Sequence, residues 1–435
     1  MGYAQYKELG NSGVSWLQQK PSHWRIKRLK FSTDLINDKV SVEDSPSPYI
    51  GLEHIESWTG RKINGEIRNS EGLASSFTTG DVLFGKLRPY LAKVHLAQQD
   101  GLISSEALVV RSKDELHANF LKYYMLSRDF INVVDSSTYG SKMPRASWDF
   151  IGNLPVLLPE VEEQKTIARF LDFKTAQIDA LITKQHTLLD KLAEMRTALI
   201  SHAVTKGLDP SVPMRESGVT WLGDIPAHWN AKRLKFVGKT RYGLGEPPQK
   251  LDGGLPFIRA TDVYRGEIDG AKVQTVDPDC VPWSRNPTLK AKDILVVRSG
   301  AYTGDSAIVP TQWEGSIAGY DMVYTAEGAS PEYIAFNLLS KHVLNGQIYL
   351  AKNRAAQPHL NAEELGDVVV ALPPPDEQVE IVAYIEKSMK KLVIQFELVN
   401  GVVERLHEYR SSLITNAVTG KIDVRNVLLG QLSEA

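Results

Sequence analysis

Two long stretches of the chain repeat apolar residues in alternating steps of four and three. In residues 161–205, which contain neither Pro nor Gly, eight of the ten positions in this register are apolar. Residues 376–419, interrupted only by Gly401, give the same count at an offset of 214. The two registers are Ile167, Leu171, Lys174, Ile178, Leu181, Gln185, Leu188, Leu192, Met195 and Leu199, and Ile381, Ile385, Ser388, Leu392, Gln395, Val399, Val402, Leu406, Tyr409 and Leu413. So narrow and long a stripe is typical of a coiled-coil seam.

We predict that these segments are two long helices that pack on each other as an antiparallel coiled coil. Some forty helical residues rise about 60 Å, so one small domain cannot cover the seam. The alternative is two ordinary amphipathic helices in separate cores. The polar seam positions, Gln185 and Gln395 among them, would cost stability if buried but could fix the register of the pair.

The residues before each helix alternate short apolar runs with loops rich in Gly, Pro and Asp, which predicts two globular α+β heads. In the first head we expect strands at 49–52, 81–84, 107–110 and 154–158 and a helix from about 119 to 134. In the second we expect strands at 256–258, 293–297 and 368–372 and a helix from about 331 to 348. The predicted domains are 1–158, an N-terminal clasp and first head; 159–206, a central helical spacer; 207–372, a linker and second head; and 373–435, a C-terminal helical spacer and tail.

The chain is also an internal repeat. Residues 12–31 match residues 217–236 at thirteen of twenty positions, and both copies contain Ser-Gly-Val-x-Trp-Leu, Pro-x-His-Trp and Lys-Arg-Leu-Lys-Phe. The stretch after Arg196 likewise matches the stretch after Arg410 at an offset of 214. Two copies of one module with similar ends and different middles suit a protein that recognises two different targets with one geometry.

Composition narrows the class of protein. Of the 435 residues 42% are hydrophobic and 23% charged, which is ordinary for globular chains. The single Cys280 cannot form an internal disulfide, and neither a bilayer-spanning apolar run nor a secretory leader is apparent, so we expect a cytoplasmic protein. The net charge of −2 does not indicate nucleic-acid binding, but basic residues cluster between Lys20 and Lys30, and the distribution matters more than the total.

Over nearly its whole length the chain resembles the specificity subunit of type I restriction-modification systems. The resemblance rests on Ser-Gly-Val-x-Trp-Leu…Pro-x-His-Trp at 12–24 and 217–229, and on Leu-Pro…Glu-Gln at 158–164 and 372–378. It also rests on the strand Gly-Asp-Val-Leu-Phe at 80–84 and its counterpart at 292–296. The two halves differ at one shared loop, which has Met143-Pro144 in the first half and Gln357-Pro358 in the second.

The resemblance implies two α/β target-recognition domains joined by the long helices in a pseudo-two-fold arrangement, each reading one half of an interrupted double-stranded DNA site. The helices would separate the two domains and bind methyltransferase subunits, two of them, together with restriction/translocase subunits. The partners would supply adenine-N6 methylation and endonuclease activity, so S-adenosylmethionine, ATP and Mg are expected there and no cofactor in this chain.

The residues themselves indicate no catalysis in this chain. An adenine methyltransferase needs an Asn/Asp-Pro-Pro-aromatic loop, but an aromatic residue follows neither Pro247-Pro248 nor the prolines at 373–375. Gly243-Leu244-Gly245 belongs to no phosphate-binding motif, and neither His nor Cys has the spacing of a zinc site. Glu163-Gln164-Lys165 resembles the end of a nuclease motif but stands at a helix start, where acidic residues favour the helix dipole.

DNA contacts must then come from basic and amide side chains, because Arg and Lys bind guanine edges and phosphates. We predict DNA binding by residues on loops at corresponding places in the two heads: Lys86, Arg88, Lys142, Arg145, Arg259, Arg298, Lys352 and Arg354. Any single one could instead be a solvated charge. The repeated Lys27–Lys30 and Lys232–Lys235 clusters are identical in both halves and so cannot encode different half-sites; we interpret them as structural, and phosphate contact remains the alternative. We also expect the repeated tryptophans 16, 24, 221 and 229 to clasp each linker to its frame.

The sequence thus predicts a non-enzymatic DNA-specificity subunit. Two alternatives come from other classes of protein. One is an enzyme that acts on DNA by itself, which binding of S-adenosylmethionine by the isolated chain would favour. The other is a coiled-coil adaptor with two protein-binding heads, which a failure to bind DNA would favour.

Overall fold

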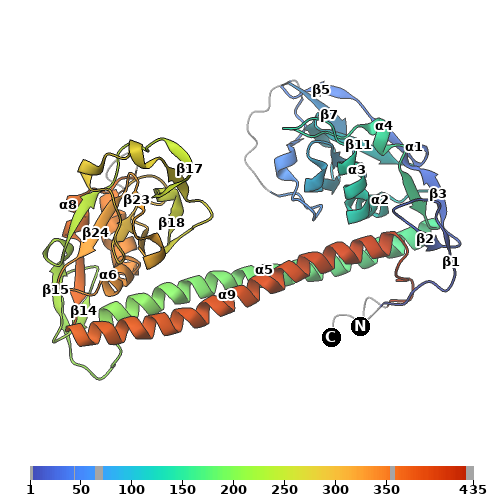
Figure 1. The fold of residues 1–435 in the computed structure, drawn as a ribbon. Coiled ribbons are helices and arrows are strands. Elements are labelled where there is room, and N and C mark those ends of the chain that lie inside the picture. Colours follow the sequence, from blue (N-terminus) through green and yellow to red (C-terminus); the bar gives the residue numbers. More distant parts are fainter. Residues whose placement is uncertain (1–2, 44, 64–71, 353–357, 428–435) are drawn as a thin grey trace. The chain divides into compact units, whose positions relative to one another are not determined.

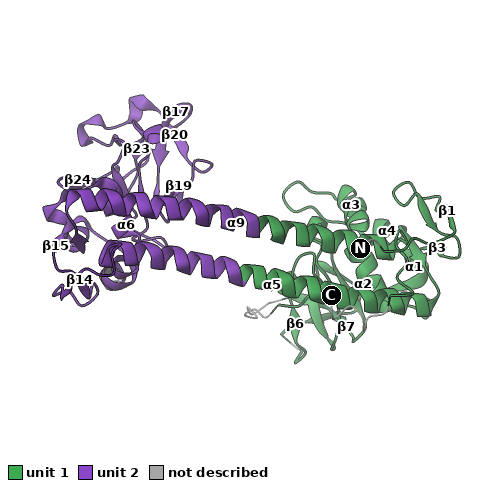
Figure 2. Cartoon of the chain, turned by 90° about the horizontal axis from the view of Figure 1, so that it is seen from below, with its two compact units in different colours: residues 1–186, 400–435 green, residues 187–399 purple. Residues whose placement is uncertain are grey.

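The computed structural model describes the chain except residues 1–2, 44, 64–71, 353–357 and 428–435. The chain divides into two compact units (Figure 2). Unit 1 comprises residues 1–186 and 400–435, and unit 2 comprises residues 187–399. Each unit contains one globular head and a part of both long helices, α5 (Val161–Lys206) and α9 (Pro375–Val418).

The head of unit 1 is built on two four-stranded sheets (Figure 1). The first has antiparallel neighbours in the order β4 (Thr33–Ile36), β11 (Ala107–Ser112), β8 (Val82–Gly85) and β9 (Val94–Leu96). The second has the order β5 (Lys39–Ser41), β7 (Leu73–Phe77), β10 (Gly101–Ser104) and β6 (Tyr49–Ile50). Because side chains alternate along a strand, Val82 and Phe84 pack in the core that contains the helices, and Leu83 packs in the core between the sheets.

The remaining elements of unit 1 cover the first sheet and close the head. Helices α2 (Ala118–Leu126) and α3 (Arg128–Ser136) contribute Phe120, Tyr124 and Phe130 to its core. Strand β3 (Arg25–Arg28) pairs antiparallel with β12 (Pro155–Leu158), which joins the start of the head to its end just before α5. The short elements are β1 (Leu9–Asn11), β2 (Gln19–Pro21), α1 (Leu29–Ser32), α4 (Trp148–Ile151), and the 3-10 turns η1 (Leu52–His54) and η2 (Pro89–Leu91).

The head of unit 2 repeats this plan. Its main sheet has the order β16 (Gly238–Tyr242), β24 (Met322–Ala326), β21 (Ile294–Val296) and β22 (Ser306–Ile308). A second sheet has the order β20 (Gln274–Val276), β17 (Lys250–Ile258) and β23 (Ile317–Ala318), and β15 (Asn230–Arg233) pairs with β25 (Val369–Leu372) as β3 does with β12. The other elements are β13 (Met214–Glu216), β14 (Asp224–Pro226), β18 (Val263–Tyr264), β19 (Glu267–Ile268), α6 (Pro331–Leu338), α7 (Tyr349–Lys352), α8 (Ala362–Asp367), η3 (Leu234–Phe236), η4 (Ala260–Asp262), η5 (Pro278–Cys280), η6 (Trp283–Arg285), η7 (Thr311–Trp313) and the π-helix η8 (His342–Ile348).

Both helices that we predicted in the heads are interrupted. The segment 119–134 is two helices, because Ser127 is extended (ψ 144°) and its buried hydroxyl donates to the Tyr124 carbonyl. The segment 331–348 is α6 followed by the π-helix. Local hydrogen bonds of a serine compete with the helix and break it. The apolar spacing continues across each break, so the sequence pattern does not reveal it.

The two long helices pair in both units. In unit 1 the first part of α5 and the last part of α9 share one core, which contains Ile167, Ile178, Val403 and Ile414. In unit 2 the last part of α5 and the first part of α9 share another, with Val204 and Ile385. Opposite ends are therefore paired in each unit, which confirms two long helices that run antiparallel.

The predicted seam is correct at eight positions and wrong at several others. The buried positions are Ile167, Leu171, Ile178, Leu192, Ile381, Ile385, Leu392 and Leu413. Leu181 is 45% exposed and Tyr409 is 48% exposed, whereas their neighbours Ile182 and Arg410 are buried. Leu188 and Met195 are exposed as well. An α-helix has 3.6 residues per turn, so a strict heptad drifts by about 20° per repeat, and the buried stripe moves to the next residue. Gln395 is exposed, which excludes it as a residue that fixes the register.

Candidate nucleic-acid interface

In unit 1 the predicted basic residues come from two segments that the fold brings together. One segment leaves β8 at Lys86, and the other is the loop at 139–146. The Ala146 amide donates to the Lys86 carbonyl (3.0 Å), and the Arg88 amide donates to the Pro144 carbonyl (2.8 Å). Arg88 has a left-handed backbone (φ 51°) at the start of η2. Lys86, Arg88, Lys142 and Arg145 thus lie on one pair of joined loops.

These four side chains are not equally available. The Arg145 guanidinium binds Glu106 through two hydrogen bonds, Nε to Oε2 (2.9 Å) and Nη2 to Oε1 (3.0 Å). The same contact holds the pKa of Glu106 below its usual value. Arg88 and Lys142 are exposed, and Lys86 is half-buried. Arg88 and Lys142 are therefore the side chains that this loop pair presents most freely to a polyanion.

Unit 2 has the same loop pair with different side chains. The Leu360 amide donates to the Arg298 carbonyl (2.7 Å), and the Gly300 amide donates to the Pro358 carbonyl (3.4 Å). These bonds place Arg298 where unit 1 has Lys86 and Gly300 where it has Arg88. His359 likewise corresponds to Arg145. The two heads therefore share the backbone of this loop pair but carry different side chains on it.

Arg298 lies between two tyrosine rings, with its guanidinium carbon 4.7 Å from the centre of Tyr242 and 4.4 Å from that of Tyr320. Its Nη2 is 3.2 Å from His359 Nε2, and its backbone amide donates to Asp321 Oδ1 (3.3 Å). Burial raises the pKa of Asp321 to about 6. Tyr242 and Tyr320 are nearly half exposed. The cluster is a half-buried arginine held between aromatic faces, which favours a fixed orientation of its donors.

Of the other basic residues predicted in unit 2, Arg259 is held by contacts outside this cluster. The Arg259 guanidinium binds the buried carboxylate of Asp262 (Nη2 to Oδ1, 3.0 Å) and the Lys272 carbonyl, so it braces the turn at η4. Lys352 is the last residue of α7, and Arg354 lies outside the described residues.

Our reading of the sequence missed the aromatic part of the site. Tyr242, Tyr320 and His359 are brought to Arg298 from three different segments. The tyrosines stand at or just before strands, at the end of β16 and two residues before β24. Tyrosine at a strand end is too common a pattern to single out from sequence.

The repeated motifs are structural. The buried Trp24 donates its indole N–H to Glu163 Oε1 (3.2 Å), and His23 binds Oε2 of the same carboxylate (2.9 Å). In the second copy, Trp229 and His228 bind the corresponding Glu377, both at Oε2, at 3.0 and 2.8 Å. The predicted clasp is confirmed for these tryptophans. Trp16 is partly buried against the core, whereas Trp221 is half exposed and lies against Gly346.

The repeated basic clusters also make intramolecular contacts. Lys27 binds Glu115 (2.6 Å), while Arg233 and Lys235 bind Asp367 (3.2 and 2.8 Å). These ion pairs support the structural interpretation of both clusters. Within the described part of the chain there is no group of three or more His, Cys, Asp or Glu side chains placed to hold a metal ion. None of the described helices is both long and apolar enough to cross a membrane.

Comparison with known proteins places the chain in one family. The family model described as the type I restriction modification DNA specificity domain matches residues 28–190 and 226–398, so each match covers a head and much of the helix after it. The type I restriction enzyme EcoKI specificity subunit of Escherichia coli (strain K12) is 25% identical over 326 residues, 72% of this chain and 68% of that protein. The MjaVIII specificity subunit of Methanocaldococcus jannaschii is 21% identical over 94% of this chain and 95% of its own length.

A solved structure shows the same fold. One chain from work on complex assembly and conformational transition of the type I R-M system aligns with a TM-score of 0.67. The alignment covers 92% of this chain and 98% of the solved chain at 17% sequence identity. Two family matches in one chain agree with the two structural repeats and favour the specificity subunit over the adaptor. The protein therefore belongs to the family of type I restriction-modification DNA specificity subunits.

Proposed function

We propose that each head of this specificity subunit reads one half of a bipartite double-stranded DNA site, and that the long helices set the spacing between the halves. The helices also bind methyltransferase subunits, two in the modification complex, and restriction/translocase subunits join the full complex. The partners carry out adenine-N6 methylation with S-adenosylmethionine, and cleavage with ATP and Mg. This chain determines which DNA sequence the complex recognises.

The observation that carries this proposal is a repeated backbone with replaced side chains. The loop pair after β8 presents Arg88 and Lys142, with Arg145 held by Glu106. The loop pair after β21 presents Arg298 between two tyrosines. Arginine pairs bidentately with guanine in the major groove, while exposed lysines and arginines contact phosphates. Two heads of one geometry and different chemistry would read two unrelated half-sites.

The test is to co-express the chain with its methyltransferase subunit and to map methylated adenines across a genome by long-read sequencing. The expected result is one motif of two short, unrelated half-sites around a gap of fixed length. Exchange of residues 25–158 for those of another family member should then change one half-site and leave the other intact.

Two outcomes would contradict the proposal. An assembled complex with active methyltransferase that methylates no split site would favour the adaptor. A change of both half-sites after the exchange of one head would show that the heads do not read independently.

A further inference from the structure

Two arginines occupy equivalent positions on the long helices. Arg196 lies on α5 in Arg-Thr-Ala-Leu-Ile, and Arg410 lies on α9, 214 residues later, in Arg-Ser-Ser-Leu-Ile. Arg410 is only 4% exposed, and Arg196 is half-buried. Burying a guanidinium is costly unless its N–H groups are bonded, so its partners show what holds it there.

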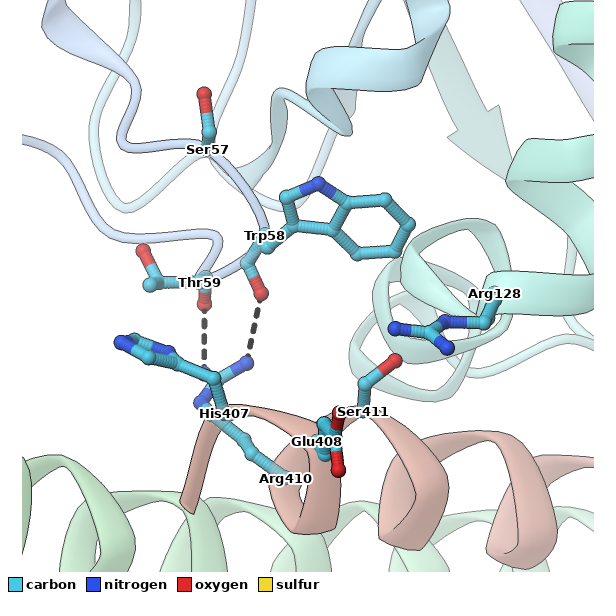
Figure 3. Close-up of a pocket in the computed structure, with 8 residues that line it drawn as sticks. All are labelled: Ser57, Trp58, Thr59, Arg128, His407, Glu408, Arg410 and Ser411. Carbon is cyan, nitrogen blue, oxygen red and sulfur yellow. Dashed lines mark hydrogen bonds between the residues drawn. The ribbon is translucent and has the colours of Figure 1, made fainter. Parts of the chain in front are cut away.

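Arg410 joins helix α9 to the head of unit 1. Arg410 lines a cavity of about 280 Å³. Figure 3 shows its guanidinium pointing at a turn of the head. Nη1 donates to the Trp58 carbonyl (2.7 Å) and Nη2 to the Thr59 carbonyl (3.1 Å). Nε donates to Asp179 Oδ1 on α5 (3.0 Å). One side chain therefore ties both long helices to the turn.

Arg196 makes the corresponding contact in unit 2. Its Nη2 donates to the Arg265 carbonyl (2.7 Å) in the turn between β18 and β19. Both turns follow a 3-10 turn and contain residues with left-handed backbone, Trp58 (φ 64°) and Arg265 (φ 43°). The next residue is Gly266, whose backbone is left-handed (φ 96°) and where an added Cβ would lie 2.9 Å from Leu339, so the turn requires glycine there. The contact is thus part of the repeat.

Each turn connects by backbone hydrogen bonds to the loop pair proposed to read DNA. In unit 1 the Trp58 amide donates to the Ala92 carbonyl (3.2 Å), and Ala92 closes the 3-10 turn that Arg88 begins. In unit 2 the Gly266 amide donates to the Ser306 carbonyl (2.8 Å), and Ser306 pairs with Val296, two residues before Arg298. The path from helix to reading loop is short in both heads.

We propose that Arg196 and Arg410 are positioning residues that fix the orientation of each reading loop on the helices and thereby restrict the gap length that the subunit accepts. This inference rests on the function proposed above. One base pair changes the distance between half-sites by about 3.4 Å and their relative rotation by about 35°. The shared hydrophobic core already holds each head on the helices, so the arginines act on the turn that leads to the reading loop. A reading loop whose turn is not tied to the helices could shift to accept such a change, and a loop tied through the arginine could not.

The two contacts are not equally strong. Asp179 also lies 3.7 Å from Arg61, which itself binds Glu56 (2.8 Å). The position that corresponds to Asp179 in the other repeat is Val393, which is 44% exposed. Arg196 therefore lacks that carboxylate, and the second head is held by fewer charged contacts.

The test measures methylation of duplexes that have the same half-sites and gaps of n−1, n and n+1 base pairs, where n is the gap of the wild-type motif. The variants are Arg196→Met and the pair Arg410→Met with Asp179→Asn, which avoids an uncompensated buried carboxylate. We expect the preference for n over n±1 to fall about tenfold or more in each, with both half-sites unchanged. The matched control is Arg405→Met, at an exposed arginine of the same helix, which should retain the preference.

Unchanged gap preference in both methionine variants, with only a lower melting temperature, would overturn the inference and leave the arginines a purely structural role. If the double variant does not assemble, Arg410→Lys and Arg196→Met decide the matter, because the single nitrogen of lysine cannot reproduce contacts that Arg410 makes through three separate nitrogens. Failure of the proposed function is distinguishable, since the wild-type complex would then methylate no split site at any gap.

Discussion

A buried glutamine at the start of each long helix allows a quantitative test of how the heads are attached to the helices. Gln164 has no exposed surface and makes three hydrogen bonds: its Oε1 accepts from the His117 amide (2.7 Å), and its Nε2 donates to the Glu115 carbonyl (2.8 Å) and the Pro159 carbonyl (2.9 Å). Gln378, its counterpart, makes two: it accepts from the Ser330 amide (2.8 Å) and donates to the Pro373 carbonyl (2.9 Å).

Replacement by leucine keeps the approximate size of the side chain and removes these bonds. At roughly 1 kcal/mol for each hydrogen bond lost, Gln164→Leu should lower the free energy of unfolding by about 3 kcal/mol and Gln378→Leu by about 2 kcal/mol. For units of this size each kcal/mol shifts the melting temperature by about 2–4 °C, so the expected decreases are about 6–12 °C and about 4–8 °C. The same substitution at the exposed Gln395 should change stability by less than about 0.5 kcal/mol.

The assay is differential scanning calorimetry of the purified chain, combined with hydrogen exchange at the amides of His117 and Ser330. Each leucine variant should increase exchange at the amide that its own glutamine binds and leave the other amide protected. The reasoning is refuted if Gln164→Leu melts within 1 °C of the wild type, or if Gln395→Leu is as destabilising as Gln164→Leu.

Three further predictions concern the reading loops. Arg298→Ala should relax the preference for one base pair of one half-site by about 5- to 150-fold, measured by methylation of singly substituted sites; an unchanged motif would exclude a base contact. Arg88→Ala should weaken binding at all sites alike and lower the salt dependence of the affinity by about one unit of slope, with a lost base preference as the contrary result. The pKa of Asp321 is raised to about 6, so the folded state binds its proton more tightly than the unfolded state and gains stability as the pH falls through that value. Wild type should therefore gain stability relative to Asp321→Asn as the pH falls from 7 to 5. If the free energies of unfolding of the two proteins change with pH in parallel, the pKa of Asp321 is not raised.

The local and repetitive part of the architecture could be predicted from the sequence. The heptad pattern, the near absence of Pro and Gly, and the prolines at or before each helix start locate α5 and α9 within one or two residues. The duplication at offsets of 205 and 214 predicts two similar heads, and the strands 107–110, 154–158 and 368–372 match β11, β12 and β25 closely. These features depend on spacing along the chain, which sequence records directly.

The chemistry of the site was decided by contacts between residues that are far apart in sequence. Arg145 appeared equivalent to the other basic residues until the fold placed Glu106 against it. Arg298 gained Tyr242, Tyr320 and His359, which come from three other segments.

The sequence by itself therefore determined that the protein has two heads on two long helices and which loops differ between the heads. Only the tertiary structure decided which residues form the seam: Arg410 is buried there instead of the predicted Tyr409, and it binds Asp179, 231 positions away in the sequence. The reason is physical: helix phase drifts by a small angle at each heptad, and a charged side chain is defined by partners that only folding brings within hydrogen-bond distance.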